Sequence, residues 1–218
     1  MWSCQNFKRK RRDKSQCRKN KTEASRLAYN KIASDYDASK EGRYTRFHIG
    51  ELSATIDLRD GDVVLDVACG NGTLLRELSK RADIQAHGID VAEEMIRAAK
   101  LRCPNMHFEV RPCCPLAWGD GSVDIITVCC AFHHFERPQE FVDECKRVLK
   151  KGGAVYVAEP NFGAAVRFLA NTIWFPFAKS GDVKVYGAKK LATFFYAAGF
   201  QAVRVYKKGA GLFLKAEK

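Results

Sequence analysis

An apolar strand that runs through a glycine turn into a helix decides the fold; it is residues 63–73, Val-Val-Leu-Asp-Val-Ala-Cys-Gly-Asn-Gly-Thr. Apart from Asp66 its strand part is apolar, as expected of a parallel strand buried on both faces. Gly70 and Gly72 let the backbone turn tightly and approach a ligand where a Cβ atom would collide. A dinucleotide-binding turn has a third glycine three residues later, but here that residue is Leu75. The turn therefore predicts a ligand site in which no pyrophosphate rests on the helix.

Two acidic residues lie close to this turn in the predicted fold. Asp66 is inside the apolar strand, so its carboxylate costs free energy unless it is hydrogen-bonded or charge-paired. We expect it to tie down the glycine turn through backbone N–H groups, and it can also favour a positively charged ligand group. Asp90 closes the next strand about 20 residues after the turn, where a carboxylate can accept both hydroxyls of a ribose. Its alternative role is to cap the helix that begins at Ala92.

Strands and helices alternate along the rest of the chain. Further strands are predicted at 84–89, 106–110, 123–130, 154–158, 202–206 and 212–216, and helices at 73–81, 92–101, 138–149 and 188–198. The last two strands flank a glycine-containing turn and are expected to form a hairpin. This order predicts an α/β fold, a Rossmann-like doubly wound seven-stranded sheet with an antiparallel closing strand.

Two helices are predicted before the first strand, one from Thr22 and one after Gly42. Their tyrosines, Tyr29, Tyr36 and Tyr44, are candidates to cover a ligand, with core packing as the alternative. The aromatic stretch 161–180 is expected to form an inserted helix or lid near the carboxyl edge of the sheet.

Composition indicates one globular domain. The 218 residues are 46% hydrophobic and 28% charged, and no apolar run approaches the roughly 20 residues that span a bilayer. The basic N-terminus is not followed by an apolar segment of the secretory type, so we expect a cytoplasmic protein.

The nine cysteines are an odd number and are expected to be reduced. There is no C-x-x-C pair, and no metal site is expected. The adjacent pairs Cys113–Cys114 and Cys129–Cys130 are expected to pack in the core, with binding of a thiophilic substrate such as arsenic as the alternative.

The formal net charge of +12 is concentrated at the N-terminus. Residues 1–22 hold nine Lys or Arg residues against Asp13 alone. We therefore expect a disordered basic tail at 1–22 and a domain at 23–218. The tail is either a solvated extension or an electrostatic arm, through residues 8–21, for RNA or an acidic membrane.

Three further motifs, at 116–124, 131–135 and 147–153, complete a pattern that begins with the glycine turn and the two acids. With them, the chain from about Tyr29 onward resembles the class I S-adenosylmethionine-dependent methyltransferases. It is most similar to the small-molecule branch that includes the ubiquinone and menaquinone C-methyltransferase-like enzymes.

The resemblance implies S-adenosylmethionine as cofactor and assigns parts of it to residues of this chain. Besides Asp66, the residues so assigned are Ala68, Gly70 and Gly72 for the methionine moiety, Asp90 for the ribose, Val91 and Met95 for adenine, and Cys129 near the sulfonium. The chain departs from many relatives at Pro112, where they have an acid that accepts from the adenine amino group. Adenine is then left to the Cys113 backbone and to apolar contacts.

Methyl transfer from a sulfonium is an in-line displacement that needs mainly positioning and exclusion of water. A general base is required only if the acceptor must lose a proton. His133 and His134 are the first candidates and Glu159 the next, with turn capping or packing as the alternative for the histidines.

The sequence leaves three functions open. The first is methylation of a small, partly apolar acceptor, and the second is methylation of RNA, such as tRNA, aided by the basic tail. Against the second, residues 128–131 are Val-Cys-Cys-Ala where base-amino methyltransferases have an Asn/Asp-Pro-Pro-aromatic motif. The third is a non-catalytic module that binds the cofactor as a ligand.

Overall fold

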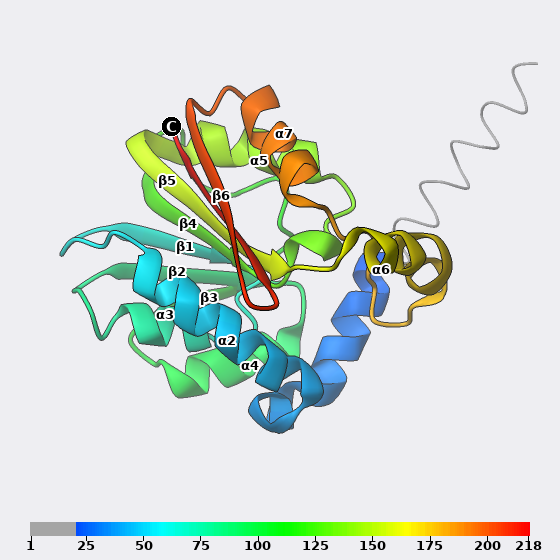
Figure 1. The fold of residues 1–218 in the computed structure, drawn as a ribbon. Helices are drawn as coiled ribbons and strands as arrows, with labels where there is room; N and C mark the ends of the chain where they lie inside the picture. Colours follow the sequence, from blue (N-terminus) through cyan, green and yellow to red (C-terminus); the bar gives the residue numbers. More distant parts are fainter. Residues whose placement is uncertain (1–20) are drawn as a thin grey trace, which may run out of the picture.

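Seven strands form one sheet in the order β3-β2-β1-β4-β5-β7-β6 in the computed structural model, which describes residues 21–218 (Figure 1). The strands are β1 (Val63–Val67), β2 (Gln85–Asp90), β3 (His107–Val110), β4 (Val123–Cys129), β5 (Leu149–Pro160), β6 (Ala202–Lys208) and β7 (Gly211–Glu217). Neighbours from β3 to β5 are parallel, and β7 runs antiparallel to β5 and to β6. The predicted seven-stranded sheet with an antiparallel closing strand is confirmed.

The strand order reverses between β1 and β4, which are paired in parallel. In a doubly wound sheet, ligands bind beyond the carboxyl ends of the strands at this reversal. The topology therefore places the glycine turn after β1 and the histidines after β4 on the two sides of one crevice.

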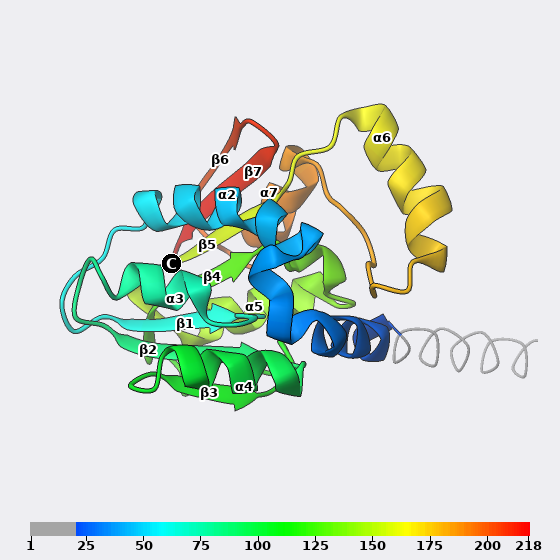
Figure 2. The same ribbon diagram turned by 90° about the horizontal axis from the view of Figure 1, so that it is seen from below.

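Helices cover both faces of the sheet. Residues 21–32 are helical and are followed by η1 (Ala33–Ala38), α2 (Lys40–Thr55), α3 (Thr73–Leu78), α4 (Glu93–Arg102), η2 (Phe132–His134), α5 (Pro138–Val148), α6 (Ala164–Leu169), η3 (Ala170–Trp174), η4 (Phe175–Phe177) and α7 (Ala188–Ala197). The elements α5 and α7 pack on one face, and α2, α3 and α4 on the other (Figures 1 and 2).

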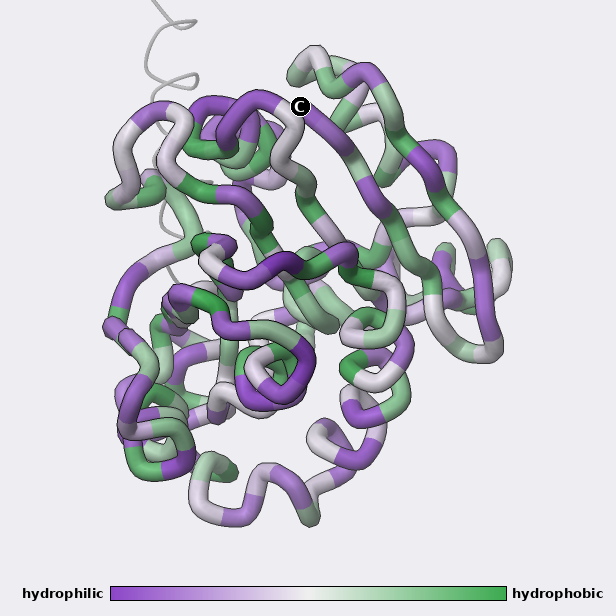
Figure 3. Tube along the Cα trace, turned by 90° about the vertical axis from the view of Figure 1, so that its left-hand side faces the viewer, coloured by the Kyte–Doolittle hydropathy of each residue, from purple (hydrophilic) through white to green (hydrophobic). Residues whose placement is uncertain are grey.

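The two cores follow from the alternation of side chains along each strand. In β1, Leu65 belongs to the core beneath α5 and α7, whereas its neighbour Val64 belongs to the core beneath α2 and α3; neither side chain is exposed. This is why β1 is a continuous apolar run rather than an alternating one. Along the outer helices, hydrophobic and hydrophilic residues alternate (Figure 3). This is expected of helices of which one side packs on a sheet and the other faces solvent.

Helix α2 begins earlier than the predicted start after Gly42. The Ser39 hydroxyl accepts a hydrogen bond from the Gly42 N–H at 3.0 Å, so Ser39 is the N-cap and the helix begins at Lys40. Gly42 is required for a different reason, because a Cβ there would lie 1.9 Å from the Tyr36 carbonyl oxygen. The chain thus folds back closely on η1, which carries Tyr36.

The aromatic stretch forms α6, η3 and η4, which confirms the predicted inserted helix. It lies at the periphery, on the side toward which the parallel strands run (Figures 1 and 2). No helix within residues 21–218 combines the length and the apolar character that crossing a bilayer requires.

Candidate functional site

A cavity of about 350 Å³ lies at the carboxyl ends of β1, β2 and β4. Eight of the twelve residues predicted for the site line it: Ala68, Gly70, Asp90, Val91, Met95, Cys113, Cys129 and His134. Four do not: Asp66, Gly72, His133 and Glu159. The predicted residues therefore divide into those that line the cavity and those that lie outside its lining.

The backbone on both sides of the reversal adopts conformations that are rare for side-chain-bearing residues. Ala68 has φ 58° at the end of β1, and Cys130 has φ 52° just after β4. Non-glycine residues with positive φ are uncommon and cluster at functional sites. Both residues line the cavity, so the strained backbone is part of its wall.

The two glycines of the turn have different roles. Both have positive φ, 52° for Gly70 and 76° for Gly72. A Cβ on Gly70 would meet nothing within 4 Å, because this residue borders the cavity. A Cβ on Gly72 would lie 2.9 Å from the Phe108 ring and 3.3 Å from Ala99, so Gly72 is needed for packing of the turn against the core.

Asp90 holds the glycine turn and faces the cavity. Its Oδ2 accepts the Gly70 N–H at 2.9 Å and its Oδ1 accepts the Ala92 N–H at 2.8 Å. Burial raises the pKa of this carboxyl, and the backbone hydrogen bonds oppose that rise. A carboxylate has about four acceptor positions, so each oxygen keeps one for a ligand. Asp90 is not the cap of the helix, because α4 begins at Glu93 and its N-cap is Ala92, without a side-chain cap hydrogen bond. The two backbone hydrogen bonds leave acceptor positions on the carboxylate that a ligand can use.

Asp66 does not take the role expected for it at the glycine turn. It is only 2% exposed and accepts a hydrogen bond from the Thr127 hydroxyl at 2.7 Å, across the β1–β4 pair. Burial raises its pKa to about 7, against the lowering effect of Thr127. The turn N–H that we expected it to bind belongs to Gly70 and is bound by Asp90 instead. Asp66 therefore supports the strand pair beneath the cavity.

Two tyrosines from the N-terminal elements form the wall opposite the glycine turn. Tyr29 and Tyr36 line the cavity with their ring centroids 6.3 Å apart. The Tyr36 hydroxyl is 3.3 Å from the Thr45 hydroxyl, and the Tyr29 hydroxyl is 3.3 Å from His134 Nε2. Tyr44 packs on His48 instead, at a centroid distance of 4.8 Å.

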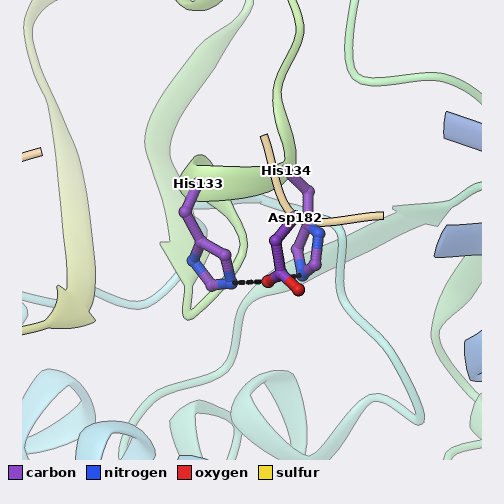
Figure 4. Close-up of side chains that lie close together, drawn as sticks. All are labelled: His133, His134 and Asp182. Carbon is purple, nitrogen blue, oxygen red and sulfur yellow. Dashed lines mark ion pairs between the residues drawn. The ribbon is translucent and has the colours of Figure 1, made fainter. Parts of the chain in front are cut away.

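His133 is held between two carboxylates. Its Nδ1 is 2.8 Å from Glu159 Oε2, and its Nε2 is 3.5 Å from Asp182 Oδ1 (Figure 4). The second oxygen of Glu159 accepts the Phe132 N–H at 2.9 Å, so this buried carboxylate also fixes the η2 turn. Burial opposes protonation of His133, but the Glu159 and Asp182 carboxylates outweigh it and raise its pKa.

His134 has the opposite electrostatic environment. Burial and the neighbouring His133 lower its pKa to about 3, so its imidazole is neutral. Its Nε2 lies 4.0 Å from Asp182 Oδ1, and the two histidine rings lie on either side of that carboxylate (Figure 4). Its buried Nδ1 has no hydrogen-bond partner among residues 21–218. His134 is thus a neutral side chain, next to Tyr29, at the cavity wall.

Asp182 is a site residue that the sequence analysis missed. It lies in the connection between η4 and α7, and the backbone there is fixed because Val183 and Lys184 both donate N–H groups to the His133 carbonyl at 3.0 Å. The available signal was that Asp182 is the single acidic residue between positions 161 and 190. Donor atoms of His133, His134 and Asp182 all lie within 4.8 Å, a spacing that a divalent cation could bridge. The contacts of the two histidines with the Glu159 and Asp182 carboxylates account for the same arrangement without an ion.

Four cysteines contribute to the cavity lining: Cys113, Cys114, Cys129 and Cys130. Burial raises the pKa of the Cys113 thiol to about 12, so it lines the cavity as a neutral, weakly polar group. In the part of the chain that the structure describes, no three cysteines bring their sulfur atoms together at ligand spacing. The thiophilic alternative therefore gains no support from the geometry.

The remaining features of the cavity suit a nucleoside with a charged tail. Met95, which has no exposed surface, and Val91 provide an apolar wall next to the Asp90 carboxylate, and Pro112 lies on the same lining. Open space borders the backbone of Gly70. These residues fit the parts of S-adenosylmethionine that the resemblance assigns to them. The apolar wall suits adenine, the Asp90 carboxylate offers acceptors for the ribose, and the Gly70 backbone leaves an edge without a side chain for the methionine moiety.

Comparisons with known proteins agree with this geometry. Residues 65–157 match the family model described as a methyltransferase domain. The demethylmenaquinone methyltransferase of Thermotoga maritima is 31% identical over 183 residues, which cover 77% of this chain and 79% of that enzyme. Several other curated relatives are matched over less than two thirds of their own length.

Solved structures show the same fold. The complex between the Haloferax volcanii Trm112 methyltransferase activator and a putative methyltransferase superposes with a TM-score of 0.74 at 19% identity, over 87% of this chain and 96% of that one. The Haemonchus contortus phosphoethanolamine N-methyltransferase 2, solved with S-adenosylhomocysteine, gives a TM-score of 0.64 at 13% identity, over 87% of this chain and 60% of that one.

The family placement favours an enzyme over a non-catalytic binding module. The chain belongs to the class I S-adenosylmethionine-dependent methyltransferases, in their small-molecule branch.

Proposed function

We propose that this enzyme methylates a small, partly apolar acceptor that binds in the part of the cavity bordered by Tyr29, His134 and Phe135. The observation that carries the proposal is that one cavity of about 350 Å³ joins this apolar, histidine-containing wall to the Asp90 carboxylate. That volume lies at the lower end of the range for small-molecule sites. It favours a small acceptor over a macromolecular surface.

The cofactor half of the cavity is proposed to act through Asp90, Met95 and the glycine turn. The cofactor supplies a methyl group on a positively charged sulfur. Asp90 would accept from the ribose hydroxyls through its two unused acceptor positions, while Val91 and Met95 contact the base. The Ala68 and Gly70 backbone would then fix the position of the methionine end relative to the acceptor.

A strong general base is not part of the proposal. A base works best when its pKa lies near the working pH, and the pKa of about 3 at His134 is far below it. The neutral imidazole can still accept a hydrogen bond from an acceptor hydroxyl and orient it. His133 and Glu159 are paired with each other and do not line the cavity, so we assign them the positioning of His134 and η2. The protein thus contributes mainly alignment and exclusion of water.

The acceptor class is tested by incubating the full chain with methyl-labelled cofactor and cell extract, then separating organic-extractable small molecules, water-soluble small molecules, RNA and protein. We expect label in the organic-extractable fraction with the wild type, and at least tenfold less with the Asp90→Ala variant as the matched control. Label in RNA or protein would overturn the proposal, as would a wild type no more active than the variant.

The RNA alternative rests on residues 8–21, of which all but Lys21 lie outside the described residues. The Lys21 ammonium donates to the carbonyls of Phe175 and Ala178. It therefore serves to attach the inserted helix, and methylation of RNA remains a prediction that the same fractionation tests.

A further inference from the structure

An apolar surface is concentrated on the inserted segment formed by α6, η3 and η4, residues 164–177. Six of the thirteen exposed large hydrophobic side chains of the described chain lie in these fourteen residues. They are between 40% and 83% exposed: Val166, Phe168, Leu169, Ile173, Trp174 and Phe177. Exposed apolar residues gathered in this way mark an interaction surface, whereas single ones do not. We call these six residues the apolar face.

The segment that carries the apolar face is held in place by its other side. Ala170 is fully buried, and Asn171 makes two hydrogen bonds to the backbone of Val185, at 2.9 and 3.0 Å. The Lys21 ammonium anchors the end of the segment through the Phe175 and Ala178 carbonyls. The exposure of the apolar face is therefore a property of the folded segment. No residue of the segment is among those that line the cavity, so the apolar face is separate from the candidate site.

In the sequence, the charged residues near the apolar face are almost all basic. Between positions 161 and 190 there are five basic residues and one acidic residue, Asp182, which is engaged with His133. Lys179 lies two residues after the segment and is exposed. The described chain begins at Lys21, which contacts the end of this segment, and residues 8–19 before it contain eight further basic residues. A partner of this surface must accept aromatic side chains and carry negative charge.

We propose that the apolar face, together with the basic residues next to it, binds the surface of an anionic lipid bilayer. Large aromatic and aliphatic side chains insert at the boundary between headgroups and acyl chains, and neighbouring Lys and Arg residues are attracted to anionic headgroups. Such binding needs no spanning helix, and it orients the carboxyl edge of the sheet toward the membrane. The proposal does not depend on the identity of the methyl acceptor.

The test uses co-sedimentation of the full chain with two kinds of vesicles, pure phosphatidylcholine and a 7:3 mixture with phosphatidylglycerol. We expect the wild type to sediment with the anionic vesicles and at least tenfold less with the neutral ones. The triple variant Phe168→Ser, Trp174→Ser and Phe177→Ser is expected to lose at least tenfold of the anionic binding. Leu101→Ser is the matched control, because Leu101 is 81% exposed on α4, outside the apolar face. It should bind like the wild type.

Binding of S-adenosylhomocysteine by the triple variant, equal to that of the wild type, would show that the variant is folded. The proposal is overturned if the wild type does not bind anionic vesicles, or if the triple variant binds them as well as the wild type does. A wild-type dimer that the triple variant loses, together with no vesicle binding, would also overturn it and assign the apolar face to a second copy of the chain.

Discussion

The two halves of the cavity are built in different ways. Most of the proposed cofactor half comes from one stretch, residues 68–95, in which the end of β1, the glycine turn, β2 and the start of α4 follow one another. The proposed acceptor half joins two distant segments, the N-terminal elements with Tyr29 and the η2 turn with His134, and Asp182 contacts the histidines from a third. The positions of the residues in the first half follow from their spacing along one stretch of chain. Those in the second half depend on a buried network of His133, His134, Glu159 and Asp182, which lie on elements far apart in sequence.

The largest effect is expected from breaking that network in the acceptor half. Glu159→Ala leaves His133 Nδ1 and the Phe132 N–H buried without their shared partner, which costs about 1–3 kcal/mol for each of the two groups. Urea unfolding should show this loss in the free energy of unfolding. Glu77→Gln, which affects only surface pairs with Lys80 and Arg76, should cost less than about 1 kcal/mol. A Glu159 variant as stable as the Glu77 variant would mean that the network does not hold the acceptor half.

A smaller effect is expected from the glycine turn, where two similar substitutions should act differently. Both Gly70→Ala and Gly72→Ala place a side chain at positive φ, which costs about 1–2 kcal/mol. Gly72→Ala should lose about 1–2 kcal/mol more in thermal unfolding, because its Cβ meets Phe108 and Ala99. Gly70→Ala should instead weaken binding of S-adenosylhomocysteine, because its Cβ would project into the cavity. Equal changes in both measurements for the two variants would contradict the separate roles.

The third prediction concerns how stability depends on pH through His134. Its pKa is lowered to about 3 in the folded protein, so between roughly pH 6.5 and 3 the unfolded chain binds one proton more at this residue. The contribution of His134 to the free energy of unfolding therefore rises with pH across that window, by up to about 1.4 kcal/mol per pH unit. His134→Asn removes the titrating group, so its free energy of unfolding should depend less steeply on pH from 6.5 to 4.5. Parallel pH profiles for variant and wild type would argue against a buried neutral imidazole.

The sequence predicted the fold and the cofactor half because their signals are local. An unbroken apolar strand, two glycines and an acid at the end of the next strand are all visible as spacing, and the structure places Gly70 and Asp90 in contact. The hydrogen-bond partners of Asp66 and Asp90 were not predictable. Both acids lie near the carboxyl ends of neighbouring strands, and only the three-dimensional arrangement decides that the Gly70 N–H donates to Asp90. Asp66 is satisfied by Thr127 on β4, a residue without any pattern of its own.

The acceptor half could be predicted only in part. His133 and His134 are adjacent in sequence, yet the pKa of the first is raised between two carboxylates and the pKa of the second is lowered by burial at the cavity. That difference depends on Asp182, which reaches the histidines from a connection about 50 residues later in the sequence. Spacing along the chain carries no information on such a contact.

The central claim is that the Asp90 carboxylate binds the cofactor while Asp66 supports the strands beneath it. Isothermal titration of S-adenosylhomocysteine into Asp90→Ala and Asp66→Asn tests it directly, with circular dichroism to verify that both variants are folded. Losing two hydrogen bonds to a charged group, at about 1.5–3 kcal/mol each, predicts a decrease in affinity of roughly 100-fold or more for Asp90→Ala. Asp66→Asn should stay within about threefold of the wild type, because Asp66 does not line the cavity. An unchanged affinity in Asp90→Ala would contradict the account.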